Sequence, residues 1–107
     1  MRIELPKFHW LLGFHEGRFV TNTFSSSLGT LGNGGCINTR TLNYRVFADI
    51  SSGNYRDFRL VAESFIIQPY NLGGGKTDME RAEFECSDDG VTQAAKWLSG
   101  ISTKYGF

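Results

Sequence analysis

Two glycine-rich segments carry residues whose types are suited to binding a phosphorylated molecule. Residues 25–41 read SSSLGTLGNGGCINTRT, and residues 71–78 read NLGGGKTD. Backbone amides exposed by glycine, together with hydroxyls beside Arg or Lys, can hold phosphate without a metal ion. We predict that both segments are loops and that they bind a small phosphorylated ligand. Their candidate contacts are Ser25, Ser26, Thr39, Arg40, Lys76 and Thr77.

Residues outside these segments add candidates for the same ligand. Tyr44 is one of several aromatic side chains on which a base could stack. Arg18 and Arg45 occupy strand positions where polar side chains are expected, and Asn22 stands just before the first segment. As a set they suit recognition of a nucleotide-like ligand, because no acid, base or nucleophile is evident among them. The alternative is that the aromatic side chains form the core and the arginines are simply solvated.

Two familiar nucleotide-binding motifs are incomplete. The sequence GGGKT at 73–77 suggests a P-loop, but that motif needs a glycine where Tyr70 stands and a helix after Thr77, where a strand is expected. The sequence LGTLGNGG at 28–35 lacks the third glycine of the dinucleotide fingerprint, whose position is taken by Ile37. Lys76 and Thr77 therefore belong either to a simple anion contact or to a plain hairpin turn.

Catalytic and metal-binding patterns are weak. His9 and His15 would lie about 20 Å apart on a straight strand, so they cannot share one metal ion. We expect neither a metal nor a cofactor, and capping of a helix explains the neighbouring Asp88 and Asp89. Cys36 together with His15 could serve as a nucleophile and base, which keeps a small hydrolase open as an alternative. The first expectation is a binding protein that is not an enzyme.

Length and charge limit the possible partners. The chain has 107 residues, which predicts a single domain over 1–107. Eleven basic and eleven acidic residues cancel, so no long-range field favours duplex nucleic acid. No run approaches the roughly 20 apolar residues of a membrane span. The first residues, MRIELPKFHW, contain no apolar leader segment. The two cysteines of the chain, Cys36 and Cys86, are expected to be free thiols in a reducing, cytoplasmic compartment.

Periodicity predicts an α+β fold, with a mainly antiparallel sheet of five or six short strands and one C-terminal helix. Alternating apolar residues predict a hairpin whose arms lie near 8–14 and 19–24, with Glu16 and Gly17 at its turn. Further strands are expected at 3–5, 43–50, 58–68 and 80–86. The 58–68 strand has apolar residues on both faces, which indicates a central strand or one that contacts another subunit.

The predicted helix spans residues 88–104. Its apolar stripe consists of Val91, Ala94, Ala95, Leu98 and Ile101. One helix covers only one face of a sheet, and the aromatic content suggests that a second protomer covers the other. We therefore expect a homo-oligomer.

The segment Phe24-Ser25-Ser26-Ser27-Leu28-Gly29-Thr30, together with the size, neutrality and layout of the chain, resembles small phage proteins that evade bacterial immunity. Among them it is most similar to the sponges that sequester cyclic nucleotide signals of Thoeris or CBASS defence. The resemblance implies a non-enzymatic oligomer in the host bacterial cytoplasm that binds a signalling nucleotide at a subunit interface. A protein-interaction inhibitor of a defence complex, of the anti-CRISPR type, is the alternative.

Overall fold

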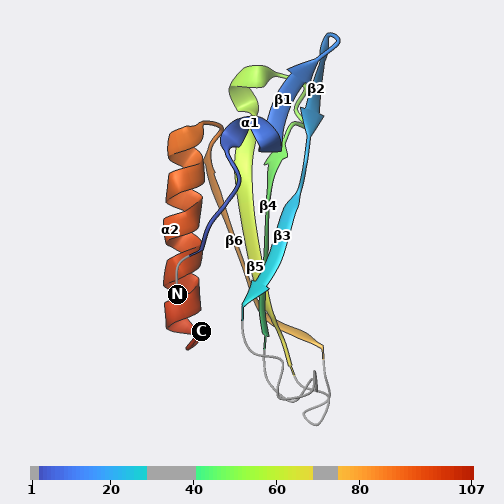
Figure 1. Ribbon diagram of the computed structural model, residues 1–107. Coiled ribbons are helices and arrows are strands. Elements are labelled where there is room, and N and C mark those ends of the chain that lie inside the picture. The colour runs from blue at the N-terminus through green and yellow to red at the C-terminus, as the bar shows by residue number, and fades with distance from the viewer. Residues whose placement is uncertain (1–2, 29–40, 69–74) are drawn as a thin grey trace.

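The computed structural model describes residues 3–28, 41–68 and 75–107. Within these residues, six antiparallel strands form two sheets, and one long helix lies at the C-terminal end (Figure 1). This confirms the predicted α+β class. The strands are β1 (Leu12–His15), β2 (Arg18–Thr21), β3 (Phe24–Leu28), β4 (Thr41–Asp49), β5 (Arg59–Ile67) and β6 (Lys76–Glu85). The helical elements are α1 (Phe8–Leu11), the 3-10 turn η1 (Tyr55–Asp57) and α2 (Asp88–Lys104).

The main sheet is an antiparallel meander with the order β3–β4–β5–β6. β4 shows the predicted alternation, since Leu42, Tyr44 and Val46 are buried while Arg45 is exposed. β5 pairs with β4 on one side and β6 on the other, which confirms the prediction of a central strand. Because β5 is paired along both edges, its backbone N–H and C=O groups are engaged in the two ladders and it has no free edge.

The helix α2 has the bounds that the sequence predicts. The Ser87 side chain caps it by accepting a hydrogen bond from the Gly90 N–H at 3.1 Å. Asp88 and Asp89 in the first turn place negative charge at the positive end of the helix dipole, which stabilises the helix. Its buried side consists of Ala94, Leu98 and Ile101. This side packs against one face of the main sheet, which supplies Leu60 and Ala62 to the same core.

The N-terminal part differs from the prediction. The hairpin turn at Glu16 is confirmed, but residues 8–11 form the short helix α1 and not a strand. Leu11 is buried in the cluster under α2, while Leu12 begins β1 and is buried in a second cluster with Ala48 and Phe58. The helical turn brings Leu11, which the strand pattern left outside the predicted apolar face, into the first of these clusters. The expected strand at 3–5 is also wrong, although Ile3 is buried in the cluster under α2.

Both predicted loops are shorter than expected. Ser25, Ser26 and Ser27 belong to β3, and the second segment enters β6 at Lys76. The reason is that the ladder bonds of a sheet are made by backbone groups, so an extended neighbour can pair with polar residues that lack strand propensity. The remaining loop predictions, at 29–40 and 71–74, lie outside the described residues.

The face of the main sheet opposite α2 is covered by no helix among the described residues (Figure 1). We call it the open face. Neither α1 nor α2 combines the length and apolar character that a membrane span needs.

Candidate functional site

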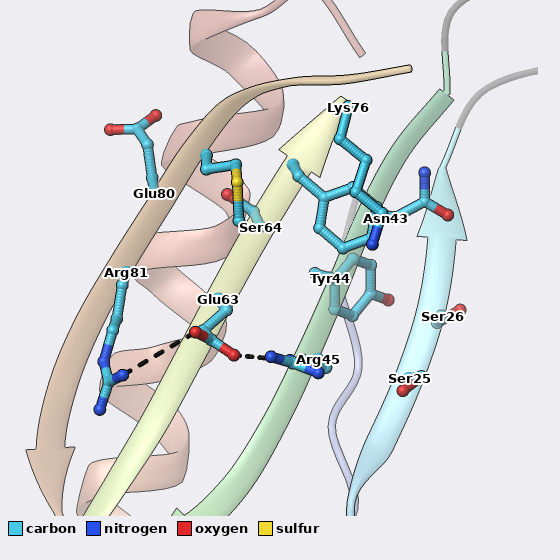
Figure 2. A pocket seen from close by; sticks show the side chains of 12 residues that line it. Ser25, Ser26, Asn43, Tyr44, Arg45, Glu63, Ser64, Lys76, Glu80 and Arg81 are labelled. Carbon is cyan, nitrogen blue, oxygen red and sulfur yellow. Dashed lines mark hydrogen bonds and ion pairs between the residues drawn. The ribbon is translucent and has the colours of Figure 1, made fainter. Parts of the chain in front are cut away.

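The open face contains a hollow of about 480 Å³ that reaches across all four strands of the main sheet (Figure 2). Pockets that bind small molecules occupy roughly 300–1,000 Å³, so the hollow has a suitable size. Polar and charged side chains alternate with the buried positions of β4 and β5 to form it. Its lining consists of Ser25, Ser26, Asn43, Tyr44, Arg45, Glu63, Ser64, Phe65, Lys76, Met79, Glu80 and Arg81.

A row of four side chains crosses the hollow because the strand register aligns them. Ser25 is paired with Arg45, Arg45 with Glu63, and Glu63 with Arg81. The Arg45 Nε donates to Glu63 Oε1 at 2.5 Å, and the Arg81 guanidinium lies 4.0 Å from Glu63 Oε2. Figure 2 shows the carboxylate of Glu63 between the two guanidinium groups. Both arginines are about half exposed, so each retains donors that face solvent.

The other end of the hollow is shaped by an irregularity in the β5–β6 pairing. The register shifts between Ser64 and Ile66, and Asp78 adopts a positive φ of 53°. Such a bulge redirects the side chains around it. The ammonium group of Lys76 lies 4.5 Å from the centre of the Phe65 ring, a distance typical of a cation–π contact. An aromatic face and a positive charge therefore lie side by side.

The hollow carries an excess of positive charge. Three cationic side chains and two carboxylates line it, and one of the carboxylates, Glu80, is paired with Lys104 of α2 at 3.4 Å. The hydrogen bond from Lys104 to this carboxylate raises the pKa of the lysine, which keeps it charged. Glu63 lies between Arg45 and Arg81, and Glu83, which does not line the hollow, lies 3.7 Å from Arg81. The lining itself therefore has one cationic side chain more than it has carboxylates.

Five of the predicted contacts line this hollow, namely Ser25, Ser26, Tyr44, Arg45 and Lys76. Tyr44 is buried in the core beside Leu98, so its ring is not available to a ligand as a stacking surface. Phe65 takes that place. The sequence predicted the residue types of the hollow but not its aromatic side chain.

The other predicted contacts are not among the lining residues. Arg18 lies on the β1–β2 hairpin, and the Asn22 side chain donates to the Trp10 carbonyl at 2.8 Å. The Thr77 hydroxyl accepts a hydrogen bond from Gln68 and donates one to Asp78, so local contacts already engage it. Thr39 and Arg40 lie outside the described residues.

Of the candidates for catalysis, the two histidines lie among the described residues. His15 is exposed at the hairpin turn, 3.9 Å from Glu16, and no group of three His, Cys, Asp or Glu side chains in the described part could hold a metal ion. Cys86 is a free thiol whose pKa is raised by burial, which lowers its reactivity. Cys36 lies outside the described residues.

Sequence reasoning missed seven lining residues: Ser64, Glu80 and a group of five, Asn43, Glu63, Phe65, Met79 and Arg81. Alternation along the strands places these five on one face of the sheet. That signal is present in the sequence. What it lacks is the register, which decides that Glu63 lies beside Arg45 and Arg81 and not beside other residues.

Comparison with known proteins adds no further assignment. No family model matches the chain, and no curated protein or solved structure is significantly similar to it.

Proposed function

We propose that the chain is a non-enzymatic binding protein that sequesters a small phosphorylated, nucleotide-like molecule in the hollow of the open face. The observation that carries the proposal is the grouping of Arg45, Lys76 and Arg81 around one exposed hollow that also contains the Phe65 ring. Arginine and lysine hold phosphate oxygens through charge-assisted hydrogen bonds. An adjacent aromatic face offers a surface on which a base stacks.

The two ends of the hollow suit the two parts of such a ligand. The half-exposed guanidinium groups of Arg45 and Arg81 lie on either side of Glu63, where a phosphate group would be held in competition with Glu63 and with Glu83, which is 3.7 Å from Arg81. Phe65 and the exposed Met79 lie at the other end, where a base would find an apolar contact. Ser25 adds a hydroxyl at the β3 border. We propose sequestration and not turnover, because both lining carboxylates, Glu63 and Glu80, are engaged in ion pairs and no hydrogen bond joins a lining serine to either of them.

This proposal agrees with the resemblance to phage proteins that sequester cyclic nucleotide signals. In that setting the chain would act in the cytoplasm of the bacterial host and remove the signal from its receptor. The ligand would leave the protein chemically unchanged.

The test is a thermal-shift measurement with inorganic phosphate, mononucleotides, linear and cyclic dinucleotides, and cyclic ADP-ribose. A ligand at a hundred times its dissociation constant stabilises the fold by about 2.7 kcal/mol, which raises the melting temperature by about 10–20 °C. Chromatography of the ligand released by heating then separates sequestration, which returns it intact, from turnover. If no compound of the panel causes a shift at about millimolar concentration, the proposal is wrong.

Three variants connect the shift to the hollow. Lys76→Ala removes a cation and should reduce the ligand-induced shift, whereas Glu63→Gln removes the carboxylate between the arginines and should increase it. Lys96→Ala is the matched control, because Lys96 is an exposed lysine of α2 outside the hollow. Opposite responses of the first two variants, with none for the control, are expected. Equal responses of all three would place binding elsewhere.

A second candidate function is a protein-interaction inhibitor. It is favoured by an aromatic cluster that joins the β1–β2 hairpin to η1, in which Phe14 of the hairpin is 66% and Tyr55 of η1 is 61% exposed. Phe19 packs against both of them and against Phe58 of the core, which anchors the cluster. Exposed apolar groups held on a rigid base are typical of protein-binding surfaces. Loss of the biological effect in a Phe14→Ser variant that still binds the ligand panel would favour this candidate.

A further inference from the structure

β3 is an edge strand with one free side. It pairs with β4 from Phe24 to Leu28, and no strand among the described residues pairs with its other side. The backbone N–H and C=O groups along such an edge form a template for another strand. Ser25, Ser26 and Ser27 are all exposed.

The opposite edge of the sheet differs in chemistry. β6 carries charges along its whole length, and the positive φ of Asp78 accompanies a shift of its register. Charged side chains and bulges are the devices that protect edge strands from pairing with other chains. β3 has no charged residue in its sequence FSSSL, and it pairs with β4 without a register shift. The two edges of one sheet thus differ in their protection.

The sequence of β3 is self-complementary about Ser26. In an antiparallel pair of two copies centred on this residue, Phe24 faces Leu28 of the second copy, and Ser25 faces its Ser27. Phe24 and Leu28 both lie on the α2 side and are half-buried, so their pairing extends the apolar core across the two copies. No like charges meet. Trp10, which is 43% exposed and packs edge-on against Phe24 at 6.4 Å, widens the apolar surface beside this edge.

We propose that two copies of the chain pair antiparallel along β3, with the twofold axis at Ser26, and that the paired sheets form one continuous sheet. The occupant of this edge is a second copy because the edge is uncharged and self-complementary, as a twofold interface requires. The open face is a poorer place for it, since the charged row of Arg45, Glu63 and Arg81 would be buried in a face-to-face contact.

The pairing has a consequence for the hollow. Ser25 and Ser26 line the hollow at its β3 border. Pairing along β3 places Ser27 of the second copy directly opposite Ser25, so each copy contributes to the border of the hollow of the other. The two hollows then lie on one continuous surface. This arrangement does not depend on the identity of the ligand.

The test is sedimentation velocity of the full chain over a concentration series from about 1 µM to about 300 µM. A five-residue edge is short beside standard interfaces, so we expect a dimer that dissociates on dilution. Ser26→Lys and Ser26→Glu should each give monomers, because both place like charges opposite each other at the axis. A mixture of the Ser26→Lys and Ser26→Glu chains should restore the dimer. Circular dichroism verifies that both variants are folded.

Ser51→Lys is the matched control, because Ser51 is an exposed serine of the turn after β4 and should leave the dimer intact. A parent chain that remains monomeric over the whole range overturns the proposal. So does an oligomer that persists in both Ser26 variants. Failure of the mixed chains to associate overturns the register about Ser26.

Discussion

The two glycines of α2 test the packing of this helix, because Gly90 is crowded by neighbouring backbone whereas Gly100 is surrounded by open space. A Cβ at Gly90 would lie 1.7 Å from the Glu85 carbonyl oxygen and 2.8 Å from its carbonyl carbon. Gly90 is thus the residue that lets the first turn of α2 approach the end of β6. A Cβ at Gly100 would meet no heavy atom within 4 Å. The same change, Gly→Ala, should therefore have opposite signs at the two positions.

The magnitudes follow from the local contacts. Gly100→Ala should stabilise the protein by about 0.5–1 kcal/mol, which is the helix-propensity difference at an exposed position. Gly90→Ala must displace the first turn of α2, and such overpacking costs about 1–3 kcal/mol. The displacement also strains the hydrogen bond from the Gly90 N–H to Ser87, and loss of a cap costs about 0.5–2 kcal/mol. We expect a net loss of about 2–4 kcal/mol, since alanine regains little propensity in the first turn.

The assay is urea denaturation followed by circular dichroism. The midpoint should rise for Gly100→Ala and fall for Gly90→Ala, with unchanged slopes, because neither change alters the surface exposed on unfolding. The melting temperature of Gly90→Ala should fall by roughly 8–16 °C or more. If Gly90→Ala is as stable as the parent chain, or gains as much as Gly100→Ala, the close approach of α2 to β6 is refuted.

Two further predictions concern buried side chains. Leu98→Ala should cost about 2–5 kcal/mol, because Leu98 is fully buried against Leu60 and Ala94, and a loss near zero in the same assay would remove α2 from the core. In a Cys36→Ser background, Cys86 should react more slowly with a disulfide reagent in the folded chain than in urea, since burial raises the pKa of its thiol. The unfolded chain releases this proton first, so stability should fall as the pH rises above the ordinary thiol pKa of 9.0. Stability that does not change across this pH range would contradict the raised pKa.

Much of the fold can be read from the sequence because its signals are local. The alternation of β4 and β5 is a property of adjacent residues, and it fixes which side chains share a face. The helix α2 is marked by the Ser87 cap and by an apolar stripe with helical spacing. The hairpin turn at Glu16 and Gly17 is likewise a local feature, with positive φ at both residues.

Other elements depend on partners that are distant in the sequence. The run FSSSL has only Phe24 as a typical strand former, and it becomes β3 because β4 supplies hydrogen-bond partners for its backbone. The α1 segment alternates like a strand, but it forms a helical turn whose Leu11 is buried with Leu98, a residue distant in the sequence.

The candidate site likewise combines features that local sequence signals predict with features that depend on distant strands. The sequence by itself determined that Arg45 and Arg81 point away from the apolar positions of their strands and that Glu63 shares a face with Val61 and Phe65, since a period of two fixes the face of every residue. It did not determine that the three form one row. Glu63 stands 18 residues from each arginine along the chain, and only the pairing of β4 with β5 and of β5 with β6 brings the three together. A shift of one residue in either register would separate the cations from the carboxylate, because strand register is decided by the packing of whole faces and not by any single residue.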